Sequence, residues 1–213
     1  MPCSFLRGSS SSQIMSEHAQ TSAVLHCHPD TACTVVESIE SSIRCQPGNV
    51  LTVTYKLKGV FKHLRIPSDG LARRADGLWQ RTSFELFIGA KNDAEYYEFN
   101  FSTSGEWQAY EFRSYREGGL LQGDGLEPRI AVQRGADILE LSVVLSLDFF
   151  PGIQSDLCLW VGLAAVVEDG NGQLSYWALK HPPGKPDFHH ADAFALELVL
   201  AGSKFEALRI AKS

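Results

Sequence analysis

The sequence predicts an all-β protein that folds as an antiparallel β-sandwich of two sheets. Short runs rich in Val, Thr, Leu and aromatic residues recur along the chain, with turn-forming residues between them. Before the C-terminal tail, no segment keeps an apolar stripe at the 3.6-residue spacing of a helix. No repeat of 20–50 residues is visible, which disfavours a propeller or a solenoid. A closed barrel is the alternative architecture.

The two ends of the chain are expected to lie outside this domain. Residues 1–22 are rich in Ser and lack a period, so they are predicted to be a disordered extension, with Met1 or Met15 as the natural start. The β-sandwich domain is placed at residues 23–201. Residues 202–213 are predicted to form a C-terminal tail, in which Ser203–Ala211 is the one candidate helix.

The first half of the domain contains several predicted strands. Thr34–Ile39 and Asn49–Leu57 are rich in Val and Thr and flank a Pro-Gly turn. Phe84–Ile88 follows as an apolar strand that carries one acid. Tyr96–Ser102 and Trp107–Phe112 then flank a Ser-Gly pair, which predicts a hairpin.

The second half has the clearest period. In Ile138–Leu147 every second residue from Leu139 onward is apolar, which predicts a half-buried strand. Leu157–Val167 is apolar on both faces and is predicted to be a central strand. An Asp-Gly-Asn-Gly turn joins it to Leu174–Leu179 in a predicted hairpin. The last predicted strand alternates through Phe194, Leu196, Leu198 and Leu200.

Composition disfavours two classes of partner. The net charge is −6, which opposes binding to the phosphate backbone of nucleic acids. The longest apolar run, Leu157–Val167, is too short to span a membrane. The odd number of cysteines and the absence of a CxxC pair predict reduced thiols, and the start of the chain lacks the apolar core of a secretory signal. The protein is therefore expected to be cytoplasmic.

A ladder of polar side chains is the first candidate site. In Tyr96–Ser102, one face presents Glu98, Asn100 and Ser102, and the other presents aromatic rings. Glu85, among the aromatic residues of the neighbouring strand, joins them. A buried carboxylate without a partner is unfavourable, and Asn and Glu are poor strand formers. These groups are therefore predicted to bind sugar hydroxyls or a cation, with an ordinary solvated sheet face as the alternative.

The tryptophans form a second candidate set. Trp79 follows a polar loop and Trp107 opens a strand just after a turn, so both are placed to stack on a flat ligand. Trp177 is a third candidate, whereas Trp160 lies in the doubly apolar strand and is predicted to be in the core. The alternative for every Trp is a place in the core.

The loop from His181 to His190 is the third candidate. Its three prolines stiffen it, and it concentrates three histidines and one carboxylate in ten residues. His181, Asp187 and His189 could ligate zinc or iron, although their spacing matches no known metal motif. The other possibility is that this loop forms the rim of a ligand site. Motifs of nucleophilic catalysis and phosphate binding are absent from the sequence.

These stretches resemble the DOMON-like family of bacterial proteins, whose fold is akin to family-9 carbohydrate-binding modules. The resemblance covers about Val35 to Leu200 and is carried by DGLWQRT at 76–82, FELF at 84–87, YYEFNFS at 96–102, GEW at 105–107, Tyr115-Arg116 and the run from Ser175 to His189. It implies a jelly-roll-like sandwich whose relatives bind sugars or haem on one sheet face. Met15, in the predicted extension, is not a plausible axial ligand, which leaves two histidines as the ligands of a haem, and sugar is therefore ranked above haem.

The leading prediction is a non-catalytic domain that binds a saccharide or glycan fragment, without a cofactor and with an unknown oligomeric state. Its ligand-binding residues are predicted to be Trp79, Glu85, Glu98, Asn100, Trp107, Arg116, Trp177, His181, Asp187 and His189. The alternatives are a metal-assisted enzyme that uses the His181–His190 loop and a haem-binding or redox domain.

Overall fold

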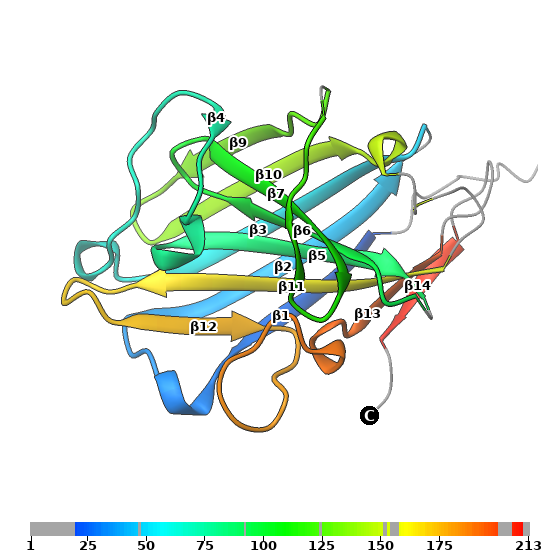
Figure 1. The fold of residues 1–213 in the computed structure, drawn as a ribbon. Helices are drawn as coiled ribbons and strands as arrows, with labels where there is room; N and C mark the ends of the chain where they lie inside the picture. Colours follow the sequence, from blue (N-terminus) through cyan, green and yellow to red (C-terminus); the bar gives the residue numbers. More distant parts are fainter. Residues whose placement is uncertain are drawn as a thin grey trace, which may run out of the picture.

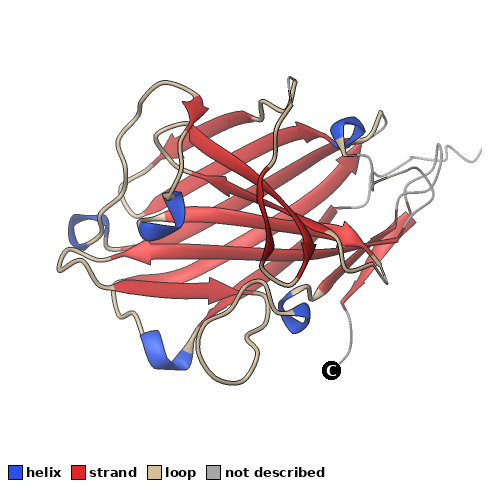
Figure 2. Cartoon of the chain, viewed as in Figure 1, coloured by secondary structure: helices blue, strands red, loops and turns tan. Residues whose placement is uncertain are grey.

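The computed structural model describes residues 20–46, 48–91, 93–123, 125–150, 153, 158–199 and 206–210. In this part the protein consists mainly of β-strands, and the helical segments are short 3-10 turns (Figures 1 and 2). None of the described helices has the length and apolar character needed to cross a membrane. The four described cysteines, Cys27, Cys33, Cys45 and Cys158, are unpaired, as expected for reduced thiols, and Cys3 lies outside the described residues.

The strands pair into one curled sheet, in the order β4-β7-β6-β5-β11-β12-β1-β2-β3-β10-β9, with β8, β13 and β14 attached beside this path. Their bounds are β1 Gln20–Cys27, β2 Val36–Gln46, β3 Val50–Gly59, β4 Arg73–Arg74, β5 Ser83–Ala90, β6 Tyr96–Phe101, β7 Glu106–Ser114, β8 Glu117–Leu120, β9 Arg129–Arg134, β10 Ile138–Ser146, β11 Cys158–Glu168, β12 Leu174–Ala178, β13 Leu196–Val199 and β14 Glu206–Ile210.

This architecture corrects the predicted pair of separate antiparallel sheets in two respects. β1 pairs with β2 through Gln20 to Leu25 and with β12 through His26 and Cys27, so the two portions are joined into one sheet. β4 pairs in parallel with β7, so the sheet is mixed, although the other pairs are antiparallel. The sheet does not close into a barrel, because the path ends at β4 and β9, which are not paired in the described part.

The front portion of the sheet (β5, β6, β7, β11 and β12) lies over the back portion (β2, β3, β9 and β10) around one hydrophobic core (Figure 1). The ring of Tyr55 on β3 lies 5.1 Å from the ring of Phe84 on β5. The Tyr55 hydroxyl also donates a hydrogen bond of 2.7 Å to the backbone oxygen of Glu85. This bond fixes the spacing of the two portions directly behind the candidate acid.

Each predicted strand forms, although some bounds differ, whereas β1, β4, β8, β9 and β14 were not predicted. Ile138–Ser146 alternates between buried and partly buried residues as predicted, and both predicted hairpins after β6 and β11 form. β1, however, was not predicted and begins at Gln20, before the expected domain start. Glu206–Ile210 is a strand that pairs with β13 rather than part of a helix, and Phe194 lies before β13 instead of in it. The predicted extension before Gln20 lies outside the described residues, as does Leu200.

β5 and the part of β11 that follows Trp160 are buried on both faces because other segments cover the outer face of the front portion. The β7–β8 hairpin crosses in front of β5 and β11, and the loop after β12 lies below β11 in this view (Figure 1). Hydrogen bonds from Tyr115 and Arg116 to Asp187 join the hairpin to that loop. Phe188 and Phe194, from the segment after β12, pack on Phe87 of β5 with ring centroids 6.4 and 5.9 Å apart. The space between the sheet face and these covering segments is where the candidate residues meet.

Candidate functional site

Strand register places the two candidate acids on the outer face of the front portion. Phe84, Leu86 and Ile88 fill the core, so Glu85 between them must point outward. Glu85 pairs with Asn100, and Phe87 pairs with Glu98, which makes the two acids diagonal neighbours on adjacent strands. The predicted alternation of β6 is present, since Tyr97, Phe99 and Phe101 lie in the core on the opposite face.

The turn between β7 and β8 carries Arg116 over this face. Arg116 has φ 57°, a left-handed conformation that is unfavourable for a residue with a long side chain. Its backbone N–H donates to the Tyr96 hydroxyl at 3.1 Å, and its Nη2 donates to Asp187 Oδ1 at 2.8 Å. Tyr115 also donates to Asp187, at 2.6 Å. These contacts join the turn to the loop after β12 and hold the Arg116 side chain in place.

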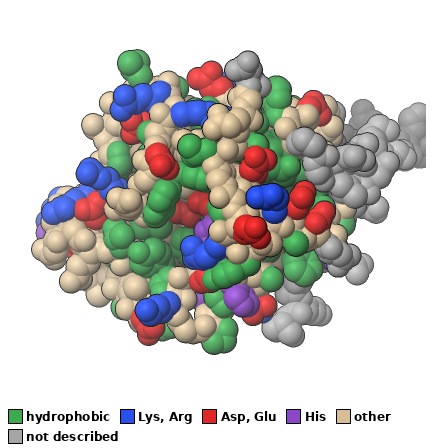
Figure 3. Space-filling view, viewed as in Figure 1, with side chains coloured by type: hydrophobic (Ala, Val, Ile, Leu, Met, Phe, Trp, Pro, Cys, Tyr) green, Lys and Arg blue, Asp and Glu red, His purple; other side chains and the backbone are tan. Residues whose placement is uncertain are grey.

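The covered face contains a cavity of about 330 Å³. It is lined by Trp79, Glu85, Glu98, Tyr110, Phe112, Arg116, Val166, Tyr176, Pro186, Phe188 and His189. Figure 3 shows acidic, basic and histidine side chains close together near the middle of this face, surrounded by hydrophobic ones. The structure therefore brings five predicted residues to one concavity: Trp79, Glu85, Glu98, Arg116 and His189.

The polar atoms of the cavity are only partly satisfied. Glu98 Oε1 accepts a hydrogen bond of 2.8 Å from Asn100 Nδ2, and Glu98 Oε2 lies 3.5 Å from His189 Nε2. Glu85 is 3% exposed, and its Oε1 has no hydrogen-bond partner. Asn100 Oδ1 is also buried without a partner. A buried carboxyl oxygen without a partner is unfavourable by about 1–3 kcal/mol, so a ligand that supplied one would recover this free energy.

Burial shifts the protonation equilibria of these groups. Burial raises the pKa of Glu85 well above its ordinary value, and the charge of Glu98 raises it further, although the nearby Ser83 hydroxyl and the Arg116 charge oppose this shift. Burial also raises the pKa of Glu98 to about 7, although the Asn100 hydrogen bond and the Arg116 charge oppose this shift. Burial lowers the pKa of His189 to about 4, with Arg116 acting in the same direction. At neutral pH the contact between His189 and Glu98 therefore involves an uncharged imidazole.

The candidate metal ligands do not come together. The Nε2 atom of His181 lies 2.8 Å from the backbone oxygen of His26, away from the cavity. Asp187 binds Tyr115 and Arg116; burial would raise its pKa, but these hydrogen bonds outweigh burial and leave the pKa low. Across the described ranges, no group of three or more His, Cys, Asp or Glu residues is placed to hold a metal. The structure therefore does not bring the three candidate metal ligands together, and His181 does not line this cavity.

Three tryptophan predictions are also corrected. Trp107 pairs with Phe101 and thus shares its core-facing side, where the Arg74 guanidinium lies 4.5 Å from the ring centroid. Trp177 is in the same core and donates to Ser175 Oγ at 3.0 Å. Trp160, predicted to be buried, is 37% exposed because its position on β11 faces outward; it lines a neighbouring cavity of about 470 Å³. Only Trp79 is available to the acid-lined cavity.

Several cavity residues were missed by the sequence analysis. Tyr110 and Phe112 follow Gln108 at every second position and so lie on the same outer face. That alternation was readable in the sequence. Tyr176 and Phe188, in contrast, depend on how the loop after β12 folds back over the sheet. Tyr96 supports the site from β6, since its hydroxyl lies 2.9 Å from His189 Nδ1.

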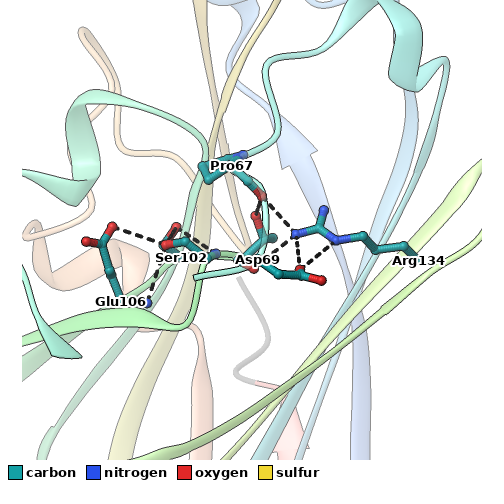
Figure 4. Close-up of polar contacts among 7 residues, drawn as sticks. Pro67, Asp69, Ser102, Glu106 and Arg134 are labelled. Carbon is teal, nitrogen blue, oxygen red and sulfur yellow. Dashed lines mark hydrogen bonds and ion pairs between the residues drawn. The ribbon is translucent and has the colours of Figure 1, made fainter. Parts of the chain in front are cut away.

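Ser102, predicted as part of the ladder, belongs to the β6–β7 turn instead. Its hydroxyl accepts from the backbone N–H and the hydroxyl of Ser104, at 3.2 and 2.9 Å (Figure 4). Next to this turn, Arg134 at the end of β9 donates to Asp69 Oδ1, to the Pro67 backbone oxygen and to the Thr103 backbone oxygen (Figure 4). Arg134 thereby links β9, one end of the strand path, to the loop before β4, its other end.

Replacing Arg134 by Ala is expected to lower the free energy of unfolding by about 1–3 kcal/mol, because the Thr103 carbonyl and the Asp69 carboxylate lose their donor and the Pro67 carbonyl keeps only the Thr103 hydroxyl. Urea unfolding measures the change. Arg129→Ala, on an exposed position of the same strand, is the control and is expected to change stability by less than about 0.5 kcal/mol. Equal free energies of unfolding for the two variants would show that the Arg134 contacts between β9 and the loop before β4 do not contribute to stability.

Comparison with known proteins establishes the fold but not a family. No protein-family model matches the sequence, and no curated protein matches it. The structure is similar to that of a putative carbohydrate-binding protein from Bacteroides uniformis, with a TM-score of 0.60 and 14% sequence identity, over 81% of this chain and 83% of that chain. At this identity the likeness shows a shared fold alone.

Two more distant structures belong to a family 9 carbohydrate-binding module from Caldicellulosiruptor kristjanssonii. The complex with glucose has a TM-score of 0.46 and 13% identity, over 72% of each chain. The complex with cellotriose has a TM-score of 0.45 and 11% identity, over 77% of this chain and 74% of that chain. Membership of the DOMON-like family stays a prediction. The described chain is thus a mostly-β protein with the fold of its Bacteroides uniformis neighbour and an acid-lined cavity on the front portion of its sheet.

Proposed function

We propose that this protein binds a saccharide in the cavity that Glu85, Glu98 and Arg116 line. The observation that carries the proposal is the Glu85 carboxyl group, which is buried in the cavity wall with Oε1 unpaired. Folding has left a strongly polar atom without a protein partner at a place where a small molecule fits. A ligand rich in hydroxyl groups would complete its hydrogen bonding.

The walls of the cavity suit the other surfaces of a sugar. A pyranose ring has apolar C–H faces and a polar edge, so it needs rings on its faces and hydrogen-bonding groups at its edge. Trp79 and Tyr110 lie with ring centroids 5.8 Å apart at a nearly perpendicular angle of 73°, and Phe112 and Tyr176 line the same space. Aromatic side chains of this kind contact sugar faces, while Glu85, Glu98 and Arg116 reach the hydroxyl groups.

The volume of the cavity limits the size of the ligand. About 330 Å³ is at the lower end of the range of roughly 300–1,000 Å³ for small-molecule sites, so we expect a mono- or disaccharide, or the end of a longer glycan. The fold that this chain shares with a putative carbohydrate-binding protein accords with the proposal, but the cavity itself carries it.

A calorimetric screen of mono- and oligosaccharides tests the proposal. We expect dissociation constants between about 1 μM and 1 mM, which correspond to about −8 to −4 kcal/mol. The proposal would be contradicted if no sugar in the screen gave a heat of binding at concentrations up to millimolar.

Trp79→Ala is expected to weaken saccharide binding about 3- to 10-fold, since aromatic contacts of this type contribute about 0.5–1.5 kcal/mol. Calorimetry of the variant with the sugar found in the screen measures the loss. Trp160→Ala is a matched control, because Trp160 is similarly exposed (37% against 40% for Trp79) but lies outside the cavity. The stacking role is wrong if both variants bind as the unaltered protein does, or if only Trp160→Ala weakens binding.

A further inference from the structure

The two carboxyl groups in the cavity receive different support from the protein. Glu98 has a donor near each oxygen: Asn100 Nδ2 at 2.8 Å from Oε1, and His189 Nε2 at 3.5 Å from Oε2. Glu85 Oε1 has none and is buried. Donors favour the ionised form of a carboxyl group, whereas burial without donors favours the protonated form. The geometry therefore favours a carboxylate at Glu98 and a carboxylic acid at Glu85.

The tautomer of His189 follows from its neighbours. The Tyr96 hydroxyl accepts the backbone N–H of Arg116, so we assign its proton to the hydrogen bond with His189 Nδ1. The Nε2–H of the ring then faces Glu98 Oε2. The His189 backbone N–H donates to Asp187 Oδ1 at 3.1 Å and fixes the base of the side chain. A neutral imidazole is thus positioned to stabilise the Glu98 carboxylate without giving up its proton.

The protonation equilibria support the same assignment. Burial raises the pKa of Glu98 to about 7, so at neutral pH a substantial fraction is ionised and able to take a proton. Burial and the neighbouring Glu98 hold the pKa of Glu85 well above its ordinary value, so this group stays protonated and able to give one. A pair of carboxyl groups with separated pKa values in one cavity is the arrangement of a general acid and a general base.

The two groups are also close enough to act on one sugar ring. They are diagonal neighbours on β5 and β6, positions whose Cβ atoms are typically about 7–8 Å apart or less, and both side chains line the same cavity. In a bound aldose, the anomeric hydroxyl and the ring oxygen are attached to the same carbon. One carboxyl group can therefore contact the hydroxyl while the other contacts the ring oxygen.

We infer that the cavity also catalyses mutarotation, which is the interconversion of the α and β anomers of a bound aldose. In this reaction Glu98 is the general base and Glu85 is the general acid. The inference rests on the saccharide site proposed above. Nothing but the sugar is consumed or formed, and the reaction requires neither an oxidant nor a second substrate. Arg116, held by Asp187, contributes its positive charge beside both carboxyl groups.

The proton transfers balance in each direction. Glu98 takes the proton of the anomeric hydroxyl while Glu85 gives its proton to the ring oxygen. The bond between the anomeric carbon and the ring oxygen breaks with its electron pair on the oxygen, and the anomeric carbon becomes the aldehyde of the open chain. After rotation about the adjacent carbon–carbon bond, the new hydroxyl attacks the other face of the aldehyde. Glu85 recovers its proton from that hydroxyl, and Glu98 returns its proton to the new anomeric oxygen.

The test follows the optical rotation of freshly dissolved α-D-glucose, α-D-galactose and α-D-xylose at pH 7 in dilute buffer, with calorimetry of the same sugars in parallel. For a sugar that binds, we expect the rate constant of mutarotation to rise in proportion to protein concentration. Glu85→Gln and Glu98→Gln are each expected to lower the protein-dependent part about 100-fold or more. Far-UV circular dichroism verifies that both variants are folded.

Glu140→Gln is the control, because Glu140 lies on β10 in the back portion of the sheet. The rate constant of mutarotation with this variant is expected to match that with the unaltered protein. If a sugar binds by calorimetry but its mutarotation is no faster than in buffer, the catalytic inference is wrong and saccharide binding stands. A rate that survives both Gln substitutions would overturn the roles of the two acids. If none of the three aldoses binds, the inference fails, and the wider saccharide screen then decides the proposed function separately.

Discussion

Replacing Glu85 by Gln is expected to stabilise the fold and to weaken saccharide binding at the same time. The buried Glu85 carboxyl has an unpaired oxygen and a pKa raised first by burial and then by the charge of Glu98. The folded protein therefore holds this proton to a higher pH than the unfolded chain does. Gln has nearly the same shape and no charge, so we expect the free energy of unfolding to increase by about 1–3 kcal/mol.

Binding is expected to change in the opposite direction. A ligand hydroxyl that meets the carboxyl in the unaltered protein meets an amide in the variant, and the expected loss is about 1–3 kcal/mol, or roughly 5- to 150-fold in the dissociation constant. Urea unfolding and calorimetry measure the two effects. Glu140→Gln, on the opposite portion of the sheet, should change neither the free energy of unfolding nor the dissociation constant beyond experimental error. A destabilised Glu85→Gln variant would mean that the carboxyl has a structural role, and the case for a ligand there would be lost.

Glu98 is expected to make stability depend on pH between about 4.5 and 7. Burial raises its pKa from 4.5 to about 7, so within this window the folded protein binds a proton that the unfolded chain has released. The free energy of unfolding therefore falls as pH rises through the window. In Glu98→Gln this contribution is absent, so the variant should gain stability relative to the unaltered protein as pH rises, by up to about 3 kcal/mol.

Other groups around Glu98 also titrate. Glu85 has a raised pKa and acts in the same direction as Glu98, whereas His189, whose pKa burial lowers to about 4, makes stability rise with pH between about 4 and 6.5. Asp187, Arg116, Tyr96 and Tyr110 are also nearby. All of these groups are present in both proteins, so most of their contributions cancel in the difference. Glu85 is the exception: without the Glu98 charge its pKa is less raised, which adds to the expected gain in stability of the variant. Urea unfolding of both proteins at pH 4.5, 5.5, 6.5 and 7.5 measures the difference in their free energies of unfolding. A difference that is constant with pH would show that Glu98 titrates normally.

The sequence predicted the β-strands well because alternation of apolar residues is a local property. The core face of β6 and the outward position of Glu98 and Asn100 follow from the period of Tyr96–Phe101 alone. The same reasoning, extended across the β6–β7 hairpin, would have placed Trp107 beside Phe101 in the core. Trp107 follows a turn, which is typical of a stacking position, but its register with Phe101 turns the ring into the core.

Features that depend on contacts between distant parts of the chain were harder to predict from the sequence. The pairing of β1 with both β2 and β12, which converts two predicted sheets into one, depends on contacts between distant segments. In the loop after β12, His189 points into the cavity while His181 lies against His26, although both belong to one histidine-rich run. No local pattern distinguishes these two histidines. Only the fold of the loop over the sheet determines which one meets Glu98.

The most direct test of saccharide binding in this cavity is a crystal structure of the protein soaked with the sugar that binds best in the calorimetric screen. We expect a sugar in the cavity beneath Arg116, with one oxygen about 2.6–3.2 Å from Glu85 Oε1 and a ring face against Trp79 or Tyr110. A cavity that holds only water at a saturating sugar concentration would contradict this expectation. A sugar bound solely at another surface, such as beside Trp160, would do so equally.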